Sequence, residues 1–171
     1  MEQQVNNPVA IESKRRLVNA LLALMEEKPY FKINIQELAT RAGMDRRTFY
    51  RNFDSKEDVL KRYMDIFMKR YMVSLKNQKD LTIDKAVITL IDLIEEYKPL
   101  IILLNKSEIV FLLLDYINRH LETVTEIIQE SSLYELEGSF EDQLAYNLGG
   151  AFNYTIRNII KEQDITKDEN E

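Results

Sequence analysis

Glycine and proline are scarce in this chain, which has 4 glycines and 3 prolines among its 171 residues. Both residues mark turns, and sheet proteins need many turns between short strands. Hydrophobic residues make up 45% of the chain, enough to bury a sizeable core. A chain poor in turn residues and rich in Leu, Ile, Glu and Lys is therefore predicted to be all-α.

Apolar residues recur along the chain at steps of three and four, which places them on one face of a helix. The short helices have local start signals as well. Asn34 with Glu37, Asp45, and Ser55 with Asp58 have the residue types and spacing of N-terminal helix caps. We expect helices over residues 13–27, 35–42, 46–52, 56–76, 83–96, 99–105, 108–130 and 140–161.

Charge divides the chain unevenly. Residues 1–76 hold 15 Lys and Arg against 10 Asp and Glu, a balance of +5. Residues 77–171 hold 8 against 19, a balance of −11. The basic N-terminal part suits a polyanionic partner, whereas the acidic remainder does not. Chance clustering of solvated charges is the alternative explanation at this point.

The composition also bears on the compartment. The chain has no cysteine, which excludes disulfides, thiolate metal sites and cysteine nucleophiles. Its first residues are polar and do not resemble a signal peptide. The longest apolar runs, residues 99–104 and 109–114, are too short to span a bilayer. We therefore expect a cytoplasmic protein that does not contact the membrane.

Two of the short helices meet at Gly43 and together form a helix-turn-helix pattern. Ala39 is small enough to let the second helix approach, and Phe49 is large enough to fill the core beneath it. Arg binds guanine edges and phosphates, and Thr, Tyr and Asn bind phosphates or base edges, so the second helix suits the major groove of DNA. Its outward positions are Arg46, Arg47, Thr48, Tyr50, Arg51 and Asn52. Helix-turn-helix shapes also occur in proteins that bind no nucleic acid, and surface arginines are common.

This segment resembles a known family. Residues 35–60 read IQELATRAGMDRRTFYRNFDSKEDVL and are similar to the DNA-binding domain of TetR-type transcriptional regulators. The positions that match the family's signature are Leu38, Ala39, Ala42, Gly43, Met44, Thr48, Tyr50, Phe53, Lys56 and Leu60. Asp45 stands where the family usually has serine, and Asn52 where it has histidine or tyrosine. The resemblance extends over roughly residues 10 to 60.

The resemblance implies two domains. Residues 1–60 would form a three-helix DNA-binding domain, with the helix-turn-helix at about 34–53. Residues 61–171 would form a helical bundle that binds an effector and dimerises through its last two helices. It also implies that Asn34 and Lys56 contact phosphates, while Thr48 and Tyr50 meet the DNA backbone and groove.

The C-terminal part matches the family less closely. KPLIILLNKS and AYNLGGAFNYTIRNIIKE resemble the C-terminal domain common among Gram-positive members, although the usual closing tryptophan is missing. Gly149 and Gly150 lie within a predicted helix and, with Tyr154, indicate either a close helix crossing at a dimer interface or a kink. The aromatic residues that could line an effector pocket could equally be core or dimer contacts. They are Phe67, Tyr71, Tyr97, Phe111, Tyr116, Tyr146 and Tyr154.

These features predict a homodimeric transcriptional regulator that binds a palindromic operator in double-stranded DNA. Repression released by an effector, either a small molecule or a protein partner, is the family's default. An adaptor or coactivator that acts through protein contacts is the alternative. We do not expect an enzyme, a cofactor or a metal site, because motifs for catalysis are missing and the single histidine, His120, is expected on the polar side of its helix.

Overall fold

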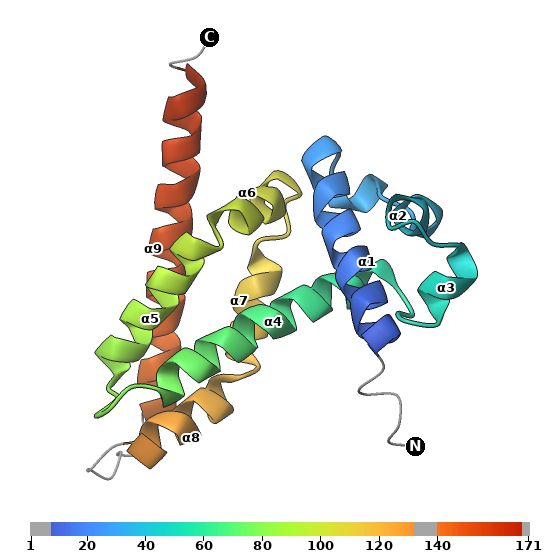
Figure 1. Ribbon diagram of the computed structural model, residues 1–171. Helices are drawn as coiled ribbons and strands as arrows, with labels where there is room; N and C mark the ends of the chain where they lie inside the picture. Colours follow the sequence, from blue (N-terminus) through green and yellow to red (C-terminus); the bar gives the residue numbers. More distant parts are fainter. Residues whose placement is uncertain (1–7, 132–139, 169–171) are drawn as a thin grey trace. The chain divides into compact units, whose positions relative to one another are not determined.

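The computed structural model describes residues 8–131 and 140–168, and every regular element within these ranges is helical (Figure 1). The prediction of an all-α chain is therefore confirmed. The chain divides into two compact units, residues 1–66 and 67–171. The boundary falls within the fourth α-helix, α4, which spans Lys56–Lys76.

The first unit is built around three helices that precede α4. They are α1 (Pro8–Glu27), α2 (Ile35–Arg41) and α3 (Arg46–Tyr50), with a short 3₁₀ helix, η1 (Tyr30–Lys32), before α2. Helix α1 packs against α2, and α2 packs against α3. The core of this unit includes the fully buried side chains of Leu17, Leu21, Leu38, Ala39, Phe49 and Val59.

In the second unit, the described residues form the end of α4 and five further helices. They are α5 (Ile83–Glu96), α6 (Lys98–Lys106), α7 (Phe111–Asn118), α8 (Leu121–Ser131) and α9 (Phe140–Asp168). Helix α9 packs against α5, α6, α7 and α8, and it runs beside α5 in Figure 1. Leu144, Leu148 and Phe152 recur every four residues on the buried face of α9. On the opposite face of this helix, the side chains of Tyr146 and Tyr154 are exposed.

The prediction of one long helix over residues 108–130 is wrong. Helix α7 ends at Asn118, and α8 begins at Leu121. At the break, the backbone N–H of His120 donates to Ile117 O at 2.9 Å, which closes a tighter turn than an α-helix has. The Nδ1 atom of His120 lies 2.8 Å from Tyr116 O. His120 is thus half-buried at a helix junction and does not lie on a polar helix face as expected.

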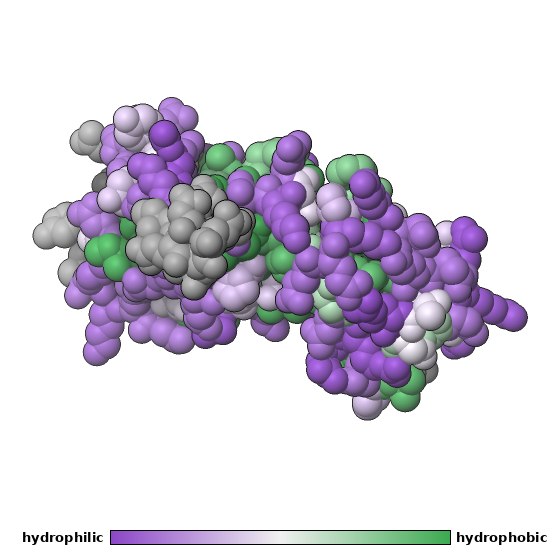
Figure 2. Space-filling model, turned by 90° about the horizontal axis from the view of Figure 1, so that it is seen from above, coloured by the Kyte–Doolittle hydropathy of each residue, from purple (hydrophilic) through white to green (hydrophobic). Residues whose placement is uncertain are grey.

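Hydrophilic residues cover most of the face drawn in Figure 2, and hydrophobic residues show between them in smaller patches. Among the helices of the described residues, none is both long enough and apolar enough to cross a membrane.

Candidate nucleic-acid interface

The turn between α2 and α3 has the geometry that its sequence predicts. Gly43 has φ of 68°, a left-handed conformation that residues with a side chain rarely adopt. The backbone N–H of Met44 then donates to Ala39 O at 2.9 Å, which closes the turn. Ala39 and Phe49 are fully buried on either side of it. The turn therefore holds α3 against α2 through a packed core.

Both helices of the motif are capped by side chains. Asn34 Oδ1 accepts the backbone N–H of Glu37 at 2.9 Å, so the amide nitrogen of this exposed side chain is the group left to donate to a phosphate. Asp45 Oδ1 accepts the backbone N–H of Thr48 at 2.6 Å. That hydrogen bond holds the pKa of the Asp45 carboxyl below its ordinary value. Two of the predicted caps are therefore present at the starts of α2 and α3.

Helix α3 and its C-cap residue, Arg51, expose a cluster of cationic side chains. Arg46, Arg47 and Arg51 are all exposed, and none of them forms an ion pair with a carboxylate of the described residues. Tyr50 beside them is 45% exposed. By contrast, Arg41 at the end of α2 pairs with Glu27 at 2.7 Å. The arginines of α3 are thus available to an external anion.

Arg46 and Tyr50 lie one helical turn apart and contact each other. The guanidinium carbon of Arg46 lies 5.6 Å from the centroid of the Tyr50 ring. One Nη atom of Arg46 donates to Tyr50 Oη at 3.3 Å. The tyrosine therefore restricts the directions in which this arginine can point.

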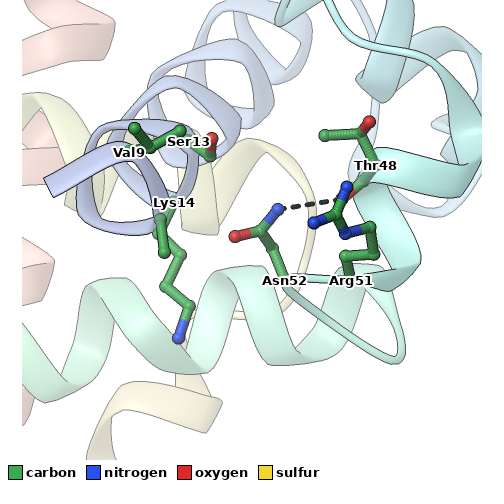
Figure 3. A pocket seen from close by; sticks show the side chains of 7 residues that line it. Val9, Ser13, Lys14, Thr48, Arg51 and Asn52 are labelled. Carbon is green, nitrogen blue, oxygen red and sulfur yellow. Dashed lines mark hydrogen bonds between the residues drawn. The ribbon is translucent and has the colours of Figure 1, made fainter. Parts of the chain in front are cut away.

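A groove of about 410 Å³ lies beside α3, between it and the first turns of α1 (Figure 3). Its walls are formed by Val9, Ala10, Ser13, Lys14, Thr48, Arg51 and Asn52. Asn52 Nδ2 donates to Thr48 O at 2.8 Å, which fixes the amide at the groove. Thr48, Arg51 and Asn52 were expected to contact DNA, whereas Ser13 and Lys14 were not. The basic run Lys14-Arg15-Arg16 was the available signal in the sequence.

Lys56 differs from the other predicted phosphate ligands. Its side chain is half-buried, and its ammonium donates to Tyr30 O and Ile33 O, each at 3.0 Å. The resemblance implied a phosphate contact for this residue, but the ammonium is already engaged by the backbone of its own unit.

In the second unit, the predicted pocket residues do not share one environment. Phe67, Tyr71 and Tyr116 are buried, and Tyr97 is half-buried with its ring 5.3 Å from that of Phe67. The Tyr71 hydroxyl donates to Ala86 O at 2.9 Å.

The other two predicted pocket residues are exposed. Phe111 is 61% exposed and Tyr146 is 82% exposed, because both point away from the core of the second unit. These positions do not support the expectation that they line a pocket within the chain.

The predicted interface residues lie on α9. Gly149 is half-buried, Gly150 is exposed and Tyr154 is 69% exposed. Tyr146, Gly150 and Tyr154 follow one another at four-residue steps, so they share one helix face. We call these three residues the α9 face.

Residues 17–63 match the family model described as bacterial regulatory proteins, tetR family. The matched segment contains the second half of α1, the whole of α2 and α3, and the start of α4. No curated protein and no solved structure matches the chain.

Proposed function

We propose that this chain, whose residues 17–63 match the tetR family of bacterial regulatory proteins, is a repressor that binds a palindromic operator as a homodimer. The family consists of DNA-binding transcription regulators. Repression, the operator and release by an effector are the finer parts of the proposal. The protein would act in the cytoplasm, where it has access to DNA.

One observation carries the proposal: Arg46 and Arg47 on α3, and Arg51 directly after it, are exposed and form no ion pair with a carboxylate of the described residues. Three cations on and directly after one short helix repel one another and are stabilised when a polyanion approaches. A helix in the major groove presents the residues of its first turn to base edges. Arg46 and Arg47 would therefore contact bases. The residues around the groove beside α1, including Lys14 and Arg51, would bind the phosphate backbone.

The homodimer would use the α9 face. An exposed Tyr146 and Tyr154 on either side of Gly150 offer apolar area with a position where a second helix can approach closely. Two copies related by a twofold axis would then place two α3 helices on two half-sites of a palindrome. An effector bound by the second unit would release DNA if it favoured a spacing of these helices that the operator does not fit.

A gel-shift experiment with DNA from upstream of the gene tests this proposal. We expect a specific complex at nanomolar protein that a scrambled duplex does not form. Arg47→Ala should lower the preference for the operator by roughly 1–3 kcal/mol, the value of one bidentate contact to guanine. Arg15→Ala is the matched control, because Arg15 is exposed on α1 but paired with Glu12 at 2.6 Å. A dimer that binds no duplex would favour the adaptor function instead.

The effector is tested separately, by a thermal-shift screen of small molecules. A ligand that binds the folded state raises the melting temperature by mass action. A true effector should also lower operator affinity in the gel shift. A ligand that raises the melting temperature and leaves operator affinity unchanged is not the effector.

A further inference from the structure

The ammonium of Lys56 binds the backbone directly before α2, an interaction that the family match does not describe. Lys56 is the first residue of α4, and its ammonium donates to Tyr30 O and Ile33 O at 3.0 Å and to Phe31 O at 3.5 Å. A lysine ammonium has three N–H donors. All three therefore have backbone carbonyls of residues 30–33 within reach. We call this arrangement the Lys56 clasp.

The ring of Tyr30 strengthens the clasp. The Lys56 Nζ atom lies 4.5 Å from the centroid of this ring, a distance at which a cation is attracted to the π face. The ring is buried, and its hydroxyl donates to Glu57 Oε1 at 3.1 Å. Two successive residues in the first turn of α4 therefore hold the 3₁₀ helix η1. Lys56 binds its backbone carbonyls, and Glu57 accepts a hydrogen bond from the Tyr30 side chain.

The clasp acts on the backbone directly before the helix-turn-helix. Ile33 accepts a hydrogen bond from Lys56, and the next residue, Asn34, is the cap of α2. Helix α2 packs against α3, which carries the exposed arginines. Moving the ammonium to a phosphate would remove a donor from these carbonyls, and carbonyls that lose their partners destabilise the fold.

We infer that Lys56 is a positioning residue: it sets the start of α2, and through α2 the orientation of α3, and it does not bind a DNA phosphate. The inference rests on the proposed function, because α3 must read DNA for its orientation to matter. It predicts that the clasp is already closed in the DNA-free protein.

The first test uses the wild-type protein and needs no DNA. Limited acylation with an N-hydroxysuccinimide ester, followed by peptide mass spectrometry, measures how fast each lysine reacts. Lys56 should react several-fold more slowly than Lys61, which lies on the same helix and is exposed. Equal rates would overturn the inference, since a lysine kept for phosphate would be open to the reagent.

The second test compares Lys56→Met with Arg51→Met, an exposed position beside the groove. Each lost phosphate contact makes the log–log salt dependence of DNA binding shallower by about 0.9, or roughly 2 units for a dimer. Arg51→Met should show this change. Lys56→Met should keep the wild-type slope, lose operator preference several-fold, and exchange the amide hydrogens of residues 34–41 faster than the wild type.

The outcomes separate the possible roles of Lys56. A slope that becomes shallower in Lys56→Met by about 2 units would make it a phosphate ligand and overturn the inference. A lower melting temperature with unchanged operator preference in the folded variant would make the clasp merely stabilising, and would overturn the positioning role. If Lys56→Met does not fold, the acylation rates still decide whether the clasp exists. If the wild type binds no duplex, the proposed function fails, while acylation and amide exchange still test the clasp.

Discussion

Arg46 and Arg47 are neighbours in sequence, but their side chains differ in conformational freedom. The guanidinium of Arg46 lies against the Tyr50 ring and donates to its hydroxyl, whereas Arg47 has no such contact with an aromatic ring of the described residues. Holding a long side chain before binding reduces the conformational entropy that is lost when DNA is bound. Of the two arginines, Arg46 is therefore the one that the free protein already orients.

This difference predicts how substitutions combine. Tyr50→Leu should weaken operator binding in the wild type but cost little more in an Arg46→Ala background, because the tyrosine acts through that arginine. Arg47→Ala should add its full effect to Tyr50→Leu, roughly 1–3 kcal/mol if it reads guanine. Double-mutant cycles from gel-shift affinities measure both couplings. Full additivity between positions 46 and 50 would show that the contact has no role in binding.

The cap of α3 predicts a dependence of stability on pH. The Thr48 N–H lowers the pKa of the Asp45 carboxyl in the folded state, so ionised Asp45 stabilises the fold above its unfolded pKa. That stability is lost as the pH falls through the lowered folded value. Asp45→Asn should therefore melt below the wild type at pH 7, and the gap should close in acid, below about pH 4. Melting curves across this range, with the exposed Asp54→Asn as control, measure it. A gap that persists unchanged in acid would contradict the role of charge.

At the scale of the helices, the helix starts that are set by local capping residues could be predicted from the sequence. Features that depend on tertiary contacts could not. Asn34, Asp45 and Ser55 predict the starts of α2, α3 and α4 correctly, because a cap bonds to a backbone N–H only a few residues away. The break between α7 and α8 was missed. The apolar spacing from Ile117 to Leu121 continues across it as in one helix.

At the candidate site, too, local features could be predicted from the sequence, whereas contacts between distant residues could not. The outward positions of α3 follow from helical periodicity, so its exposed arginines were predicted. The wall that α1 adds to the groove depends on how α1 packs, which no local pattern encodes. The position of Lys56 beside Tyr30 likewise depends on contacts over 26 residues of sequence. The resemblance to a family could not reveal either contact.

Substituting alanine for Gly43, in a turn, and for Gly150, in α9, should change the free energy of unfolding in opposite directions. Gly43 has φ of 68°, so Gly43→Ala should destabilise the first unit by roughly 1–2 kcal/mol. Apart from its own helix backbone and chain neighbours, a Cβ at Gly150 would meet none of the described residues within 4 Å, so Gly150→Ala should stabilise α9 by roughly 0.5–1 kcal/mol. Denaturant titrations at concentrations low enough to dissociate a dimer measure both changes. Equal signs would show that backbone conformation does not decide these two positions.

For the whole molecule, the distribution of charge leads us to expect that only the N-terminal part of the chain binds DNA. The balance of +5 in residues 1–76 attracts a polyanion, and the balance of −11 in the remainder repels it. In the proposed complex, a single copy of α3 would cover only one half-site, so high affinity would require two copies held at a fixed spacing. The second unit would supply that spacing through a dimer contact, without touching DNA itself.

Gly150→Leu tests the dimer contact at the α9 face. Gly150 is exposed, and none of the described residues outside its own helix backbone would lie within 4 Å of its Cβ, so each subunit should accommodate the leucine and remain folded. At a close helix crossing, however, the leucine would force the two helices apart. Sedimentation should then show monomers, and operator affinity should fall towards the non-specific level. Asp92→Leu, an exposed position on α5, is the control and should remain dimeric. If Gly150→Leu also remains dimeric and binds the operator fully, the subunits associate through another surface, and the exposed tyrosines of α9 have a different partner.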